Sequence, residues 1–323
     1  MKICLLGYSG NIGSKLLTKL NNIKNNLILI SRTKKQKSDK LKYIFCDLNE
    51  KNDELREALS DCDIIINMIG EYKDESKMMQ TNFGLVQNLF EHINVGKRKK
   101  KIHFVQISSC SVYGYNNQKR YLSENSKTIP TNYYGKTKLY AENFIKKNKN
   151  KLFTFSIIRP SGVINNTNNN SLLKFLNIAT KKIVILFGKK DSIGNFVHID
   201  DLIELIYEVS FNKKAQNKIY NISNNFNYLD LLRYIDKKLS ISPVRIYFYS
   251  DLFLKIYLSL RKLLSNFFNI PDISFLAYKT KYDSSLIMKD LNFKFKKDIK
   301  KTLLNNLINK KITNSRKKFD NNI

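Results

Sequence analysis

A glycine-rich turn close to the N-terminus constrains the fold of this chain more than any other feature. Residues 2–6 form a short apolar run, Gly7, Gly10 and Gly13 follow, and apolar residues then recur at helical spacing. In such a turn the first glycine permits a tight bend, the second lets the backbone approach a pyrophosphate, and the third lets the helix pack on the strand. The positive N-terminal end of the helix then faces the phosphates. We therefore predict dinucleotide contacts at Gly7, Gly10, Asn11, Ile12 and Gly13.

Apolar runs and helical segments alternate through the first half of the chain. Continuous apolar runs indicate buried parallel strands, and the helices between them cover both faces of a sheet. We predict strands at 2–6, 27–30, 43–46, 63–68, 102–107 and 153–158, and further helices at 53–59, 82–93 and 134–145. This order predicts an α/β fold: a Rossmann-type doubly wound parallel sheet with a smaller C-terminal substrate-binding domain. We expect a dinucleotide-binding domain at 1–162, a mixed region that completes the sheet and forms the substrate domain at 163–313, and a polar tail at 314–323.

The composition excludes several classes of protein. Hydrophobic residues make up 42% of the 323 residues, which is enough to bury a core. The four cysteines are scattered without a C-x-x-C pair, so we expect neither a metal site nor a disulfide framework, and a reduced, cytoplasmic setting. The chain contains no run of 18 apolar residues, so we expect no transmembrane segment. We interpret the apolar N-terminus as a first strand and not as a signal peptide.

The net charge of +30 comes almost entirely from lysine. Lysine outnumbers arginine 48 to 9 and is spread along the whole chain. A nucleic-acid-binding protein concentrates its charge on one face, so we interpret these lysines as solvated loop residues and expect no nucleic-acid partner. A positive field of this size favours an anionic small-molecule substrate.

The end of the second predicted strand bears on the choice of cofactor. An acidic residue is expected there when NAD is bound, because it accepts a hydrogen bond from the ribose 2′-hydroxyl. This chain has Ser31 and Arg32 instead, a hydroxyl and a cation that suit a 2′-phosphate. We therefore favour NADP, with NAD as the alternative.

A tyrosine and a lysine four residues apart begin the predicted helix at 134–145. This spacing places the Tyr134 and Lys138 side chains on one face of the helix. An ammonium beside a phenol stabilises the phenolate and lowers the phenol pKa, which makes Tyr134 a usable general acid or base. Ser109 lies in a hydroxyl-rich segment that closes a buried strand and would donate a second hydrogen bond to the reacting oxygen.

Taken together, these residues resemble the extended short-chain dehydrogenase/reductase family, the NAD(P)-dependent epimerases and dehydratases of nucleotide sugars. The resemblance covers nearly the whole chain in order, up to a C-terminal segment with Tyr282-Asp283 followed by Leu291-Asn292-Phe293. It implies that Ser109, Tyr134 and Lys138 are catalytic, and that Lys138 also binds the nicotinamide ribose. The further cofactor contacts that it implies are Asp47, Leu48, Gly70, Asn82 and Pro160.

Two departures from the family pattern narrow the expected reaction. Sugar 4,6-dehydratases carry Asp-Glu directly after the catalytic hydroxyl, whereas Cys110 and Ser111 occupy those places here. Dehydration is therefore disfavoured, and we interpret Cys110 as a buried structural thiol. Many members also hold the nucleotide diphosphate with an arginine where this chain has Gly194, so the nucleotide is the weaker inference.

The function implied by the resemblance is hydride transfer between NAD(P) and a sugar carbinol. We expect a nucleotide-sugar 4-epimerase or 4-keto reductase in surface-polysaccharide precursor synthesis. The alternative is a non-catalytic dinucleotide-binding subunit or assembly protein of the same fold, and a homodimer is left open. A third hypothesis concerns residues 252–268, whose apolar face we expect to pack on the core; the alternative is docking on a membrane surface.

Overall fold

The computed structural model describes most of the chain, and the elements below are drawn from that part. The residues it does not describe are 22–25, 33–40, 49, 51, 94–99, 115–120, 167–170, 250–251, 253–255, 258, 261–262, 264–275, 277 and 321–323. Most of the helix expected at 252–268 therefore lies outside the described residues.

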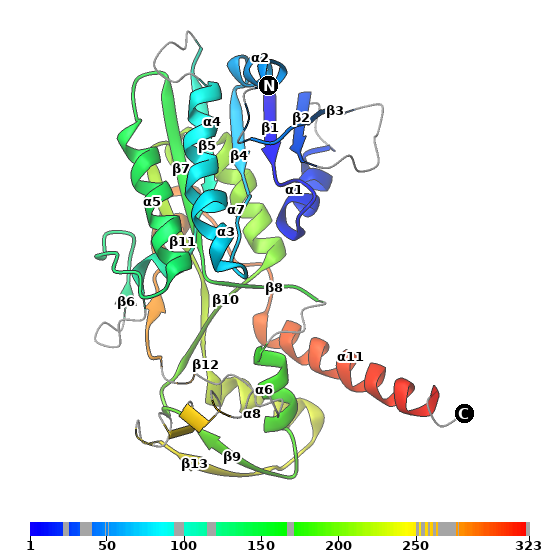
Figure 1. The fold of residues 1–323 in the computed structure, drawn as a ribbon. Coiled ribbons are helices and arrows are strands. Elements are labelled where there is room, and N and C mark those ends of the chain that lie inside the picture. The colour runs from blue at the N-terminus through cyan, green and yellow to red at the C-terminus, as the bar shows by residue number, and fades with distance from the viewer. Residues whose placement is uncertain are drawn as a thin grey trace.

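A seven-stranded parallel sheet forms the larger lobe (Figure 1). Its order is β3-β2-β1-β4-β5-β7-β11, which confirms the predicted doubly wound, Rossmann-type fold. The strands are β1 (Lys2–Leu6), β2 (Asn26–Ser31), β3 (Lys42–Phe45), β4 (Ile64–Asn67), β5 (Ile102–Ile107), β7 (Phe153–Pro160) and β11 (Lys218–Ile222). The strand order reverses between β1 and β4, so a crevice opens at the carboxyl ends of these two strands.

Two layers of helices cover the sheet, because alternate strand residues are apolar on both faces. In β1, Ile3 and Leu5 pack into one cluster, and Cys4 and Leu6 pack into the other. The first cluster is closed by α1 (Asn11–Asn21), α7 (Ile199–Phe211) and α10 (Ser285–Leu291). The second is closed by α2 (Asp53–Ser60), α4 (Leu85–Ile93) and α5 (Tyr133–Lys147). Both faces of the sheet are thus dry, as its apolar strands require.

The helical run before α4 is longer than expected. It starts with α3 (Glu75–Met79), passes through the π-helical turn Gln80–Gly84 and continues into α4. The sequence pattern predicted only the part from Asn82 onward. A π-helical turn inside a helix often marks a functional site.

The smaller lobe packs around a third apolar cluster (Figure 1). Its strands are β8 (Gly162–Ile164), β10 (Ile193–His198) and β12 (Asn224–Asn227) in one sheet, and β9 (Ile183–Phe187) with β13 (Val244–Phe248) in another. Its helices are α6 (Ser171–Ala179), α8 (Tyr228–Leu239) and the first half of α11 (Ile299–Asp320). The short strands β6 (Tyr121–Leu122) and β14 (Lys281–Tyr282) pair beside the lobes, and 3₁₀ turns lie at Cys110–Tyr113 and Lys213–Ala215. Because α7 and β11 return to the large sheet, the two lobes are interleaved along the chain.

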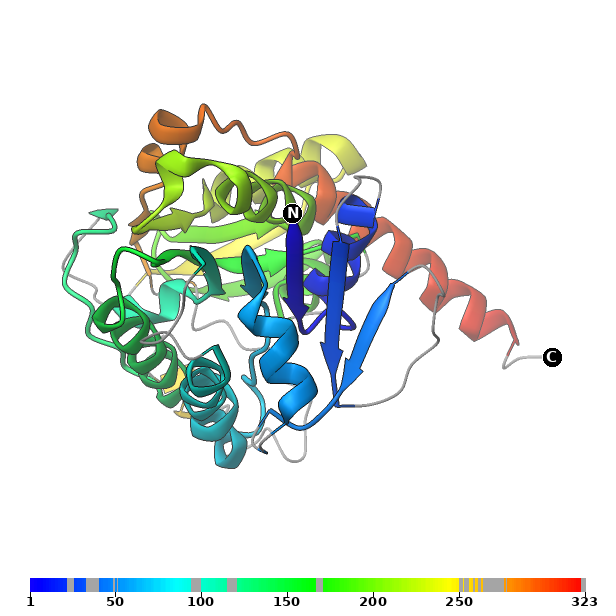
Figure 2. The ribbon, with the colours of Figure 1, turned by 90° about the horizontal axis from the view of Figure 1, so that it is seen from above.

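The C-terminal part differs from the sequence prediction in two ways. Helix α11 continues to Asp320 and so includes most of the expected polar tail; Figures 1 and 2 show it extending away from both lobes. Within 252–268, the described Ile256, Leu260 and Leu263 are exposed, so the expectation that this apolar face packs on the core is wrong for these residues. Of the residues of this segment that the structure describes, Tyr257 packs against the third cluster. In the described part of the chain, no helix is both long enough and apolar enough to cross a membrane.

Candidate active site

The glycine turn lies at the carboxyl end of β1, in the crevice where the strand order reverses. Gly7 has φ +80°, a conformation that favours glycine, and its carbonyl accepts a hydrogen bond of 3.0 Å from the Gly10 amide. A Cβ atom on Gly13 would lie 2.1 Å from the Gly7 oxygen, so only glycine lets α1 pack this closely on the turn. Helix α1 begins at Asn11, and its N-terminal amides face the crevice, as an anion-binding turn requires.

A hollow of about 500 Å³ extends from this turn toward β2 and β3. It brings together the residues predicted for the adenosine end of the cofactor, namely Ser31, Arg32, Asp47 and Leu48. The sequence reasoning missed further lining residues, which come from the β3 end and from the π-helical run: Cys46, Gln80, Thr81 and Leu85. No motif marks these residues, because their contribution depends on how the α3–α4 run packs over the crevice.

A second hollow, of about 810 Å³, meets the first at Gly7, Gly10 and Gly70. It contains the remaining residues predicted to bind the cofactor or to act in catalysis: Asn11, Ile12, Gly13, Ser109, Tyr134, Lys138 and Pro160. The predicted set, Asn82 excepted, therefore lines one continuous crevice over β1, β4, β5 and β7. Its length and its glycine floor fit an extended dinucleotide.

Tyr134 and Lys138 lie on one face of α5, as their spacing predicted. The Lys138 Nζ atom lies 5.9 Å from the centre of the Tyr134 ring. Ser109 forms a side-chain hydrogen bond with Tyr134 that lowers the tyrosine pKa, but burial has the larger effect and raises this pKa to about 12. The net shift of the Tyr134 pKa is therefore upward, opposite to the lowering that was expected from Lys138, because burial has the larger effect.

Lys138 is buried and hydrogen-bonded to the main chain. Its Nζ donates to the carbonyl oxygens of Ile107, at 3.2 Å, and Ile69, at 3.4 Å. Burial lowers the pKa of Lys138 to about 8, while the charge of Glu142 opposes this shift. The amine is thus held between the ends of β4 and β5, where it can donate toward the crevice.

Asn82 and Gly70 lie next to the Lys138 segment and fix the place of its side chain. The Asn82 amide donates to the Glu71 carbonyl and to the Thr137 hydroxyl, and its oxygen accepts from the Glu71 amide. Asn82 is 1% exposed and lines neither cofactor hollow, so the structure places it as a brace between the β4 loop and α5. A Cβ atom on Gly70 would lie 2.8 Å from Lys138 Nζ, so a glycine here leaves the amine its place.

A buried ion pair supports the site and was missed from the sequence. The Arg159 guanidinium pairs with Glu142 through two nitrogens, and both side chains are at most 2% exposed. Glu142 also accepts from Ser108 Oγ at 2.6 Å, and Arg159 donates to the Tyr113 hydroxyl at 2.7 Å. Glu142 follows Lys138 by four residues, so its helical spacing was the signal that could have revealed it.

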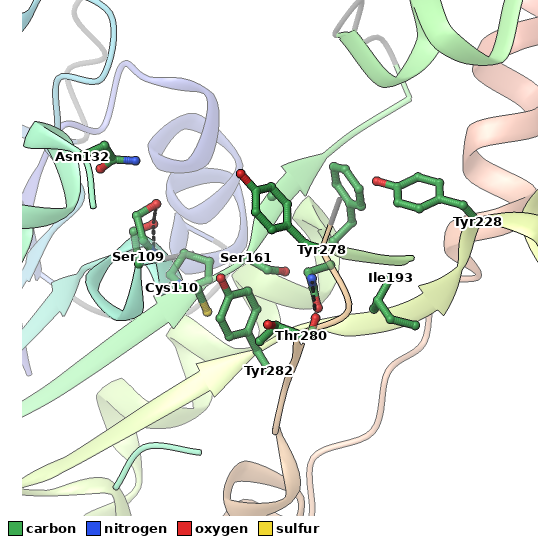
Figure 3. Close-up of a pocket in the computed structure, with 15 residues that line it drawn as sticks. Ser109, Cys110, Asn132, Ser161, Ile193, Tyr228, Tyr278, Thr280 and Tyr282 are labelled. Atoms are coloured by element: carbon green, nitrogen blue, oxygen red, sulfur yellow. Dashed lines mark hydrogen bonds between the residues drawn. The ribbon is translucent and has the colours of Figure 1, made fainter. Parts of the chain in front are cut away.

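A third hollow, of about 300 Å³, lies against Ser109 between the two lobes (Figure 3). Its walls carry the aromatic rings of Phe196, Tyr228, Tyr278 and Tyr282. In the close-up, Tyr278 and Tyr282 stand between the Ser109 side of the hollow and the Tyr228 side. None of its described lining residues is charged, in agreement with the missing arginine noted at Gly194. This neutral aromatic wall suits a sugar ring.

Cys110 borders the third hollow but is held as a structural residue. It is 2% exposed, and its thiol donates to the Arg159 carbonyl at 3.1 Å. Burial raises the pKa of this thiol well above its usual range. The thiol is thus neutral, and the interpretation of Cys110 as a buried structural residue agrees with the structure.

The comparisons with known proteins define the class. The chain matches the NAD dependent epimerase/dehydratase family over residues 3–223, more than half of its length, and therefore belongs to that family. A curated relative is N-acetyl-alpha-D-glucosaminyl-diphospho-ditrans,octacis-undecaprenol 4-epimerase of Escherichia coli O157:H7, 24% identical over 231 residues. The match covers 68% of this chain and 66% of that protein, so the chain spans just under two thirds of its relative.

Solved structures of low sequence identity have the same fold. UDP-glucuronic acid 4-epimerase from Bacillus cereus in complex with NAD is 20% identical, with a TM-score of 0.67 over 95% of this chain and 97% of that one. The UDP-Glc/GlcNAc 4-epimerase of Campylobacter jejuni is 17% identical, with a TM-score of 0.67 over 95% and 98% of the two chains. At these identities the likeness establishes the fold.

Proposed function

We propose that this protein is a nicotinamide-dinucleotide-dependent 4-epimerase of a sugar carried on a diphosphate. The observation that carries the proposal is that Ser109, Tyr134 and Lys138 line one crevice, which meets the neutral aromatic hollow at Ser109. The relatives named above support the reaction. One is named for a sugar linked to undecaprenol through a diphosphate, and the others are named for UDP-linked sugars. The substrate class that these names share is a sugar attached to a diphosphate.

The chain's own residues supply the acid–base chemistry. A bound nicotinamide would supply the hydride acceptor and donor. Tyr134 takes the proton from the sugar hydroxyl and later returns it, while Ser109 donates a hydrogen bond to the same oxygen. Lys138 places its amine 5.9 Å from the centre of the Tyr134 ring, where a positive charge would offset part of the burial cost of the phenolate. Inversion requires that the oxidised sugar turn over in the hollow, where uncharged aromatic walls offer similar contacts to both of its faces.

Dehydration is disfavoured by the side chains beside Ser109. Loss of water across C5 and C6 needs an acid and a base at usable pKa. Cys110 is a neutral thiol already hydrogen-bonded to a carbonyl, and the Ser111 hydroxyl accepts from Ser109 at 3.0 Å. We therefore expect inversion at constant mass with UDP-hexoses, measured by chromatography and mass spectrometry. A Tyr134-dependent loss of 18 mass units from a UDP-hexose would overturn the assignment. A gain of two mass units by a UDP-4-keto-hexose, with NADH or NADPH as the hydride donor, and no inversion of UDP-hexoses would identify a reductase.

The catalytic pair is tested by removing one oxygen atom. Tyr134→Phe should lower turnover by about 10²–10⁴-fold, because the acid–base hydroxyl is lost while the ring still packs. Tyr140→Phe on the exposed face of the same helix is the matched control and should keep full activity. Dinucleotide binding by calorimetry should be similar in the wild type and both variants. Turnover of Tyr134→Phe within a few-fold of wild type would refute the role.

A further inference from the structure

The small β9–β13 sheet exposes an apolar face at one end of the molecule. Ile183 pairs with Val244, and Ile185 pairs with Ile246, so the four β-branched side chains form a two-by-two patch. Their exposed fractions are 66%, 58%, 53% and 48% in that order. We call these four residues the β9–β13 face. Figure 1 shows the sheet at the end of the smaller lobe farthest from the large sheet.

The opposite face of the same two strands is the buried one. Val184 and Leu186 pack into the third apolar cluster. Arg245 also turns inward, where its guanidinium pairs with Asp236 and donates to the Ala179 carbonyl at 2.8 Å. A sheet with one solvated face normally turns polar residues outward. Here Arg245 faces inward, while the four residues of the β9–β13 face are apolar and face outward. An exposed apolar patch of this kind is typical of a surface that meets an apolar partner.

Exposed lysines precede both strands of this sheet in the sequence, and we call the four named next its lysine rim. Lys181 and Lys182 immediately precede β9, and Lys237 and Lys238 lie in the last turn of α8, shortly before β13. A second copy of the chain, itself of charge +30, would bring like charges together at this rim. An anionic lipid surface supplies both an apolar layer and opposite charge.

We propose that the β9–β13 face and its lysine rim dock the protein on an anionic membrane surface. The apolar side chains enter the boundary between headgroups and acyl chains, and the lysines contact the headgroups. The exposed helical residues Leu252, Ile256, Leu260 and Leu263, from the segment for which membrane docking was the alternative hypothesis, add apolar area to the same lobe. The inference rests on this surface alone and holds for any diphosphate carrier of the sugar.

The apolar patch is tested by replacing all four residues of the β9–β13 face with threonine. Threonine keeps β-branching, so the strands should still form. We expect the full-length protein to sediment with vesicles of phosphatidylcholine and phosphatidylglycerol, and the fourfold variant to bind at least about tenfold more weakly. Ile129→Thr combined with Ile312→Thr, both at exposed sites elsewhere, should bind like the wild type. Wild-type protein that stays in the supernatant overturns the proposal.

The lysine rim is tested with a matched change of charge. Replacing Lys181, Lys182, Lys237 and Lys238 with glutamine should weaken binding at least about tenfold and reduce its dependence on salt. Glutamine at Lys127, Lys147, Lys149 and Lys151, exposed on the larger lobe, should have a much smaller effect. Equal effects of the two sets would overturn the docking site.

Light scattering tests whether the face instead binds a second copy of the chain. If the wild type is a dimer that does not bind vesicles, and the threonine variant is a monomer, the face is a dimer interface and the proposal is wrong. The variant Tyr134→Phe should sediment like the wild type, so docking and catalysis fail or succeed separately.

Discussion

At the scale of single residues, Tyr134 shows how burial and local charge compete. Its spacing from Lys138 places both on one face of α5, but spacing carries no information about solvent access. Burial raises the Tyr134 pKa to about 12, and the Ser109 hydrogen bond opposes this only in part. The spacing therefore predicts which face of α5 carries Tyr134, whereas its pKa depends on burial that the spacing does not show.

At the same scale, we predict that Arg32 favours one of the two nicotinamide cofactors. It lines the adenosine end of the crevice beside Ser31. We expect Arg32→Ala to weaken NADP binding by roughly 1.5–3 kcal/mol while leaving NAD binding nearly unchanged, because a guanidinium–phosphate contact is charge-assisted. Calorimetric titration with both cofactors measures this, with Arg56→Ala as an exposed control. A wild type that prefers NAD, or equal losses for both cofactors, would mean that Arg32 does not contact the 2′-phosphate.

At the scale of the element, helix α5 presents its chemistry at every fourth residue. Tyr134 and Lys138 face the crevice, and Glu142, one turn further, anchors the Arg159 side chain beneath it. The helix begins at an Asn132 cap whose side chain accepts from the Gly135 amide at 2.7 Å. One face of one helix thus links the reacting groups to the buried support of β7.

Removing the carboxylate of Glu142 should be costly. Glu142→Gln leaves the Arg159 charge buried without an opposite charge, which typically destabilises a fold by about 3–5 kcal/mol. Urea unfolding measures this loss in the free energy of unfolding. Glu57→Gln, at an exposed position of α2, should change it by less than about 0.5 kcal/mol. A loss of under about 1 kcal/mol for Glu142→Gln would show that the pair is not a support of the fold.

The sequence predicted the elements whose signal is local. The Gly7–Gly13 turn and the continuous apolar run 27–30 of β2 have a strong pattern, and the structure has both where they were expected. The lining of the adenosine hollow by Gln80 and Thr81 could not be predicted, because it follows from a π-helical turn packed over a distant strand. The exposed face of β9 and β13 could not be predicted either, since a run such as Ile183–Phe187 has the same composition whether it is buried or not.

At the scale of the whole molecule, burial of the histidines makes stability depend on pH. Burial lowers the pKa of all three, and that of His103 falls to about 4. His103 belongs to β5, and its ring lies with Nδ1 3.0 Å from the Thr154 hydroxyl and Nε2 3.2 Å from the Val209 carbonyl. A base with a lowered pKa in the folded state binds protons better when unfolded, so its contribution is complete above about pH 6.5 and is lost as the pH falls toward 4.

The free energy of unfolding should therefore decrease as the pH is lowered from 7.5 to 5. For His103 alone, the shift allows a change of up to about 2 kcal/mol over this interval. Urea unfolding at several pH values measures the slope, and His103→Gln should reduce it. A wild-type stability that stays constant or rises toward pH 5 would contradict the prediction.

The interleaving of the two lobes has a consequence for how the protein is made. Synthesis proceeds from the N-terminus, so the crevice residues up to Pro160 leave the ribosome before the edge strand β11 and the covering helix α7 exist. Ile287 and Phe293, which belong to the apolar cluster of the large sheet, emerge later still. One face of the nascent large sheet therefore stays exposed while most of the smaller lobe is translated. Ribosome-bound chains that stop before residue 222 should thus depend on chaperones, and the crevice becomes fully supported only after Phe293 has been translated.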